Sequence, residues 1–184
     1  FLHQRLQPVV SDDLLQAAEH PEELPFHSFF QEQLQRRLAQ NCPDLIGVSL
    51  NYLSQALCAF SLIGMLRRMI PNVPVMLGGG LITSWMCRPG WRNPFAGLVD
   101  DLVAGPGETA LLRRLNIAAP PAAVTPDYDP LPLQRYFSPG ITLPYSASFG
   151  CYWNHCAFCP EKTEGRRFQP ETMSRISTDL ETLL

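Results

Sequence analysis

Three short apolar runs, each ending at polar or glycine-rich residues, constrain the fold of this chain most strongly. They span residues 44–50, 73–77 and 98–104. Apolar runs of this length that do not alternate with polar residues are typical of strands buried on both faces of a parallel sheet. Helical patterns at 54–70 and 108–117 separate or follow them. This alternation predicts an α/β domain with three parallel neighbouring strands and the helix at 54–70 packed on one face of the sheet.

The remaining segments predict the organisation of the chain. An earlier helix begins at Ser28 and ends before Pro43, with Phe30, Leu34 and Leu38 on one face. Six prolines between 118 and 139 exclude a helix or a central strand there. We therefore expect four parts. Residues 1–27 form a weakly organised N-terminal extension with a short helix at 12–20, and residues 28–117 form the α/β domain. Residues 118–139 form a Pro-rich linker, and residues 140–184 hold a strand at 141–148, a cysteine-rich loop and a helix from Ser174.

Composition excludes several classes of protein. Hydrophobic residues make up 46% of the 184 residues and charged residues only 17%, which argues against a disordered chain. The net charge is −3 and no Lys or Arg run stands out, so we expect no nucleic-acid partner. No segment reaches the roughly 18 apolar residues of a membrane helix, so we expect no membrane contact and a cytoplasmic protein.

The most specific chemical signal is a group of three cysteines within nine residues, Cys151, Cys156 and Cys159. Thiolates are soft ligands that select iron–sulfur clusters, zinc or copper(I). A structural zinc site needs a fourth ligand. The candidates are His155 or a remote cysteine, and Cys42, Cys58 and Cys87 lie in or near apolar segments as expected for buried small residues. Three ligands without a fourth favour a four-iron cluster with one open iron, while zinc and unligated thiols stay open as alternatives.

This pattern resembles the radical S-adenosylmethionine enzymes, although the spacing is C-x4-C-x2-C where the family commonly has C-x3-C-x2-C. The longer spacing occurs in one branch, which commonly carries an upstream cobalamin-binding-like domain. Further residues that match this branch are 126–129, 131–133, Tyr136, Ser148, Tyr152 and Trp153. The resemblance implies that Cys151, Cys156 and Cys159 each bind one iron of a [4Fe-4S] cluster. It also implies that S-adenosylmethionine chelates the fourth iron, and that Phe158 packs beside its adenine.

The upstream sheet resembles the flavodoxin-like (Rossmann-like) cobalamin-binding fold. The resemblance implies that the nucleotide tail of cobalamin enters between the strand ends, where small residues allow close approach of the backbone. The positions that match are Ser49, Gly78, Gly79, Gly80, Gly105 and Gly107. The D-x-H-x-x-G signature that supplies a histidine to cobalt is absent, so a bound cobalt would lack that ligand.

The resemblance implies reductive cleavage of S-adenosylmethionine to a 5′-deoxyadenosyl radical, with an electron donor as partner and an unknown substrate. We expect residues 140–184 to be the first strand, loop and helix of a radical S-adenosylmethionine (β/α) barrel. By that expectation the parent protein is an enzyme and the 184-residue chain alone is inactive. We also expect residues 140–184 to be poorly ordered, or held by the first domain, the linker or a second copy. The alternative is a non-catalytic module that binds a corrinoid or a partner, with zinc or nothing at the cysteines.

Overall fold

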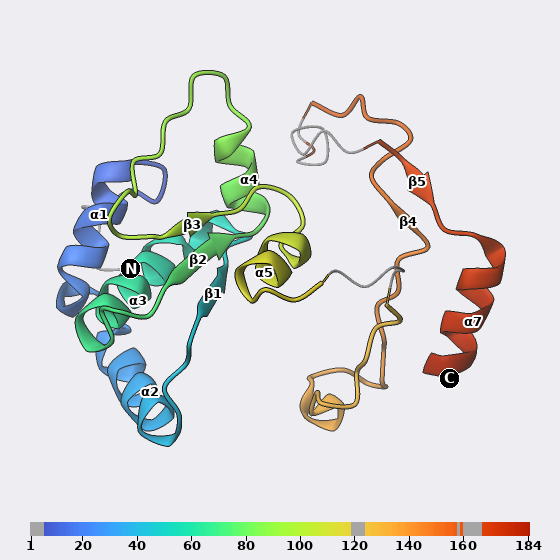
Figure 1. Ribbon diagram of the computed structural model, residues 1–184, viewed down its shortest axis with the longest axis horizontal. Coiled ribbons are helices and arrows are strands. Elements are labelled where there is room, and N and C mark those ends of the chain that lie inside the picture. Colours follow the sequence, from blue (N-terminus) through green and yellow to red (C-terminus); the bar gives the residue numbers. More distant parts are fainter. Residues whose placement is uncertain (1–5, 119–123, 158, 160–166) are drawn as a thin grey trace. The chain divides into compact units, whose positions relative to one another are not determined.

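The computed structural model describes residues 6–118, 124–157, 159 and 167–184. The chain divides into two compact units, Phe1–Arg114 and Leu115–Leu184. In the first unit, three parallel strands form a sheet in the order β1-β2-β3 (Figure 1). Their bounds are Ile46–Ser49 for β1, Val75–Gly78 for β2 and Asp101–Leu102 for β3. The prediction that the three apolar runs are parallel neighbours is therefore confirmed.

Five helices of the first unit lie among the described residues. They are α1 (Ser11–Glu19), α2 (His27–Gln40), α3 (Ala56–Met69), α4 (Gly80–Met86) and α5 (Glu108–Arg114), with 3₁₀ turns at Pro21–Glu23 and Leu53–Gln55. Together with the sheet they define a mixed α/β protein, which is compatible with a flavodoxin-like domain.

The core of the first unit lies between α3 and one face of the sheet. Phe60 and Ile63 of α3 are fully buried in one cluster with Val75 and Leu77 of β2. The ring of Phe60 lies 4.6 Å from that of Phe95, centroid to centroid, so the long segment before β3 also closes this core. The predicted packing of the helix at 54–70 on one face of the sheet is confirmed.

The N-terminal helix is part of this core, where the sequence predicted a weakly organised extension. Leu14 and Ala18, one helical turn apart on α1, are buried in the same cluster. Helix α1 packs along α3. A one-sided apolar face explains this packing, because it has to be covered by another element.

Strand β1 is buried on one face only, which corrects the prediction of burial on both. Ile46 and Val48 face the core, whereas Gly47 and Ser49 are exposed. The strand lies at the edge of the sheet. The central strand β2 differs, because Val75, Met76 and Leu77 are all buried.

The second unit holds a short antiparallel strand pair and one long helix among its described residues. A 3₁₀ turn at Leu133–Arg135 comes first in the chain. Strand β4 (Ser148–Phe149) then pairs with β5 (Gln169–Pro170), and α7 spans Met173–Leu183. The predicted helix from Ser174 is confirmed with a start one residue earlier, since the Thr172 side chain accepts a hydrogen bond from the Arg175 amide and caps it.

The predicted strand over 141–148 is wrong for most of its length. Residues 141–147 are irregular, and the strand begins only at Ser148. Pro144 lacks the N–H that a ladder requires, and the Tyr128 hydroxyl donates a hydrogen bond to its carbonyl oxygen. This contact ties the linker to the following segment, one of the arrangements expected for residues 140–184.

Candidate functional site

The first candidate site is the carboxyl edge of the parallel sheet, where ligands of open α/β sheets bind. Ser49 ends β1 and Gly78 ends β2, and the strand register pairs them directly. Asn51 links the two ends: its amide donates to Ser49 Oγ at 3.3 Å, and its carbonyl oxygen accepts from the Gly80 amide at 2.9 Å. Asn51 is the polar residue that directly follows the run 44–50, and its bridging role was not predicted from the sequence.

The middle glycine of this edge is required by the backbone. Gly79 has φ of 101°, a left-handed value that side chains disfavour. A Cβ there would stand 2.5 Å from the carbonyl oxygen of Leu50. Glycine at position 79 therefore allows the turn after β2 to lie against the backbone at the end of β1, and this requirement holds whether or not a ligand binds.

Thr83 joins the turn after β3 to the same edge. Its hydroxyl donates to the Gly79 carbonyl oxygen and accepts from the Gly105 amide, both at 2.9 Å. Gly107 follows in the chain, and its carbonyl oxygen accepts a hydrogen bond from Leu111 of α5. Asn51 and Thr83 thus join four of the predicted residues, which are Ser49, Gly79, Gly80 and Gly105. The contact described for Gly107 is with α5 instead. The sequence singled out neither Asn51 nor Thr83 as a site residue.

The edge is open on the face of β1 that looks away from the core. An added Cβ at Gly47 would meet no atom within 4 Å, and the same holds at Gly105 and Gly107. Ser49 is exposed next to this opening. Small residues and open space at strand ends can admit a flat or extended ligand close to the backbone.

The second candidate site is the cysteine segment, which we define as residues 150–168 between β4 and β5. Cys151, Cys156 and Cys159 are free thiols, each half-buried. Asn154 has φ of 46°, so the chain turns between the first and second cysteine. The Cys159 amide donates a hydrogen bond to the Cys156 carbonyl oxygen at 3.4 Å, which links the second and third cysteines.

Two contacts between rings lie within the cysteine segment. The Tyr152 ring contacts Phe168 edge-on with centroids 6.0 Å apart, and Trp153 contacts His155 in the same way at 5.4 Å. Phe158, for which a contact with adenine is expected, lies outside the described residues.

Among the residues that the structure describes, no three His, Cys, Asp or Glu side chains are grouped so as to hold a metal ion. The cysteine segment therefore carries three free thiols without gathering them around one centre. The donor set itself fits a thiolate-ligated metal, since nothing ties the sulfurs up in disulfides. Metal binding commonly supplies the free energy that closes such a site.

The remaining cysteines differ from the sequence expectation of buried small residues. Cys42 and Cys87 are exposed, and only Cys58 is partly buried. Burial raises the pKa of the Cys58 thiol, which disfavours the thiolate that a metal requires.

These features define an α/β protein with a three-stranded parallel sheet and a separate unit that carries a three-cysteine segment. Comparison with protein-family models, curated proteins and solved structures found no match for this chain. No helix in the described ranges has the length and apolar character needed to cross a membrane.

Proposed function

We propose that this chain is part of a radical S-adenosylmethionine enzyme and binds a [4Fe-4S] cluster through Cys151, Cys156 and Cys159. The observation that carries the proposal is the set of three free thiols within nine residues of one segment. Three thiolates leave one iron of a four-iron cluster without a protein ligand, which is the position that S-adenosylmethionine would occupy. The substrate stays open, and an external one-electron donor is the implied partner.

The residues of the segment have separable tasks in this proposal. The three thiolates bind iron, and the left-handed turn at Asn154 lets the chain double back between the first two ligands. The edge contact of Tyr152 with Phe168 supports one side of the segment. When bound, the cluster supplies the electron that splits the sulfonium of S-adenosylmethionine, and the protein supplies orientation and exclusion of water. Thiolate ligation also suits the cytoplasm, where thiols are kept reduced.

Anaerobic reconstitution of the chain with iron and sulfide tests the proposal. We expect a brown protein with an absorbance band at about 400 nm and about four irons per chain. Addition of S-adenosylmethionine should change the electron paramagnetic resonance spectrum of the reduced cluster, because it binds the open iron. One zinc per chain and no colour would instead support the alternative of a non-catalytic module.

The open carboxyl edge supports a second proposal, that the first unit binds a corrinoid by its extended tail next to Ser49 and Gly78. The exposed face at Gly47 favours it, since no atom there would obstruct a ligand. Gly47→Val tests it, because a branched side chain suits a strand and would fill the opening. We expect the variant to fold normally and to lose binding of hydroxocobalamin in equilibrium dialysis. Equal binding by both proteins, or by neither, would reject the proposal.

A further inference from the structure

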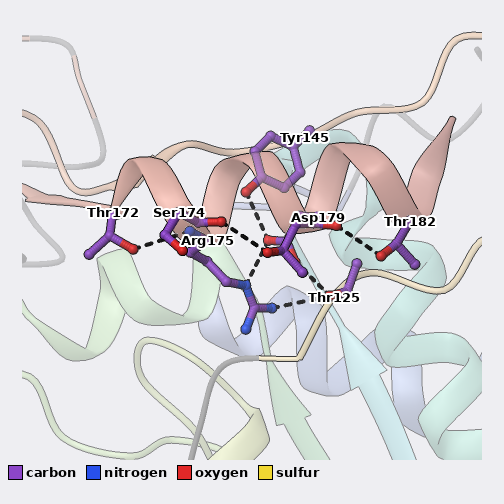
Figure 2. Close-up of polar contacts among 8 residues, drawn as sticks. Thr125, Tyr145, Thr172, Ser174, Arg175, Asp179 and Thr182 are labelled. Atoms are coloured by element: carbon purple, nitrogen blue, oxygen red, sulfur yellow. Dashed lines mark hydrogen bonds and ion pairs between the residues drawn. The ribbon is translucent and has the colours of Figure 1, made fainter.

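One carboxylate ties three distant segments of the second unit together. Asp179 of α7 is the one charged residue that is buried among the described residues, with 4% of its surface exposed. Figure 2 shows Thr125 of the linker, Tyr145 ahead of β4 and Arg175 of α7 converging on it. Its Oδ1 accepts from Thr125 at 2.5 Å, and its Oδ2 accepts from the Tyr145 hydroxyl and from Arg175 Nε, each at 2.8 Å.

Tyr145 and α7 lie on opposite sides of the cysteine segment in the chain. Tyr145 stands three residues before β4, and α7 begins three residues after β5. Between them, Ser148 pairs with Pro170 and Phe149 with Gln169, and the Glu171 amide donates to the Ala147 carbonyl oxygen at 2.9 Å. The two ends of the cysteine segment are therefore held side by side by the pairing of β4 with β5. The hydrogen bond between Tyr145 and Asp179 joins the chain just before β4 to the helix just after β5.

A two-residue ladder is too short to hold this place by itself. An isolated two-stranded hairpin is at best marginally stable in water, and both residues of β5 are exposed. The hydrogen bonds to Asp179 are of the stronger, charge-assisted kind. The carboxylate therefore adds contacts that the short ladder does not supply at the ends of the segment.

We propose that Asp179 is a positioning residue, which ties Tyr145 to α7 and thereby fixes both ends of the cysteine segment for metal binding. The proposal rests on the proposed function for its metal, but the restraint itself can be measured without one. Asp179 lies on α7, outside the cysteine segment, so it acts on the segment through the chain. A carboxylate with this role has to remain charged at neutral pH, which agrees with the hydrogen bonds from Arg175 and Thr125 that lower its pKa to about 2.

The test compares four variants with the unsubstituted chain. Asp179→Ala removes the acceptor, Tyr145→Phe removes one donor, and Asp179→Asn keeps the shape. The asparagine amide group can turn so that its oxygen faces Arg175 and Tyr145 while its N–H₂ faces the Thr125 hydroxyl, which can accept. Glu181→Ala is the matched control, because Glu181 is an exposed carboxylate on the same helix.

The first readout needs no metal: hydrogen exchange of the Glu171 amide, which reports the pairing at the ends of the segment. We expect faster exchange in Asp179→Ala and Tyr145→Phe, a smaller change in Asp179→Asn, and none in Glu181→Ala. Unchanged exchange in Asp179→Ala would overturn the proposal. Should that variant fail to fold, Tyr145→Phe decides it in the same way.

The second readout is the rate at which a chelator removes iron from the reconstituted protein. Groups that support metal ligands change metal affinity about 10- to 100-fold, and for a residue that acts through the chain we expect the lower end, about tenfold faster loss in Asp179→Ala. We expect Asp179→Asn to lose iron more slowly than Asp179→Ala, because asparagine keeps part of the hydrogen bonding. This difference would show that the contacts of residue 179, and not only an intact α7, slow the loss of iron. Faster exchange with unchanged iron loss would overturn the positioning role. If the unsubstituted chain binds no iron, the proposed function fails, and the exchange readout alone then decides whether Asp179 restrains the segment.

Discussion

Gly64 of α3 and Ala18 of α1 approach so closely that a Cβ at position 64 would stand 1.9 Å from the Ala18 carbonyl oxygen. The two helices can pack at this distance only because position 64 carries no side chain. We therefore expect Gly64→Ala to destabilise the first unit by about 1–3 kcal/mol, although alanine in a helix is normally favoured over glycine by about 1 kcal/mol.

Urea denaturation followed by circular dichroism measures the effect. Gly47→Ala is the control, since an added Cβ there meets nothing within 4 Å. If Gly64→Ala were as stable as the unsubstituted chain or more stable, α1 and α3 would be able to move apart without a cost in the free energy of unfolding.

Ser61 is a second position on α3 where a small change has a defined sign. It is fully buried, and its hydroxyl has no hydrogen-bond partner within the described part of the chain. An unsatisfied buried polar group costs about 1–3 kcal/mol. We expect Ser61→Ala to raise the free energy of unfolding by about 1 kcal/mol, and a lower melting temperature would contradict this account.

Asp179 makes the second unit sensitive to acid in a defined window. Hydrogen bonds lower its pKa from 3.8 to about 2, with the largest contribution from Arg175 and smaller ones from Thr125 and Tyr145. A lowered pKa means that its contribution to stability is fully present above pH 3.8 and is lost as the pH falls toward 2. We expect acid unfolding of α7, followed by hydrogen exchange, to shift in this window, and Asp179→Asn to respond less. An identical acid profile for both proteins would exclude Asp179 as the group responsible.

Arg67 holds the amino-terminal end of the sheet with a geometry that lysine does not offer. Its Nε donates to the Leu98 carbonyl oxygen at 2.8 Å, its Nη1 donates to Val73 at 3.2 Å, and its Nη2 pairs with Asp100. A lysine ammonium does not present this planar fork. We expect Arg67→Lys to cost about 1.5–3 kcal/mol.

The neighbouring Arg68 supplies the control for this change. Its side chain is 53% exposed, and surface ion pairs contribute about 0–1 kcal/mol. Arg68→Lys should therefore leave the melting temperature nearly unchanged, whereas similar losses in both variants would indicate a general effect of arginine removal.

Cys156→Ala tests the ligand assignment in the second unit. Removing one of three thiolates should abolish retention of iron after anaerobic reconstitution, while the first unit keeps its core. Cys42→Ala is the matched control, because Cys42 is a free and exposed thiol outside the segment. Full iron content in Cys156→Ala would refute the assignment.

The sheet was predictable because its signal is local. Strands β1 and β3 fall within apolar runs, and β2 extends one residue beyond its run to Gly78, with Val75, Met76 and Leu77 buried as expected. The extent of β3 was not predictable from the sequence. Of the run 98–104 only Asp101 and Leu102 pair with β2, while Val99 forms an isolated bridge with Ala96 and packs into the core.

The second unit was less predictable because its contacts join distant residues. β4 pairs with residues about twenty positions further along, a partner that no periodicity indicates. Arg175 and Asp179 stand four residues apart, the spacing of a helical ion pair, and that signal was available. Nothing local indicated that Thr125 and Tyr145 would join them, since such contacts depend on how the chain folds back.

The ladder of β4 and β5 has a consequence for the unusual arm between Cys151 and Cys156. The pairing of Phe149 with Gln169 fixes both ends of the cysteine segment. An extra residue between the first two cysteines therefore lengthens the loop between these anchors, Phe149 and Gln169, without moving them. Closing a longer loop costs little, about 0.6 kcal/mol for each doubling of its length. The anchors thus make this segment tolerant of length variation, so a four-residue arm and a three-residue arm can be exchanged without altering α7 or the linker.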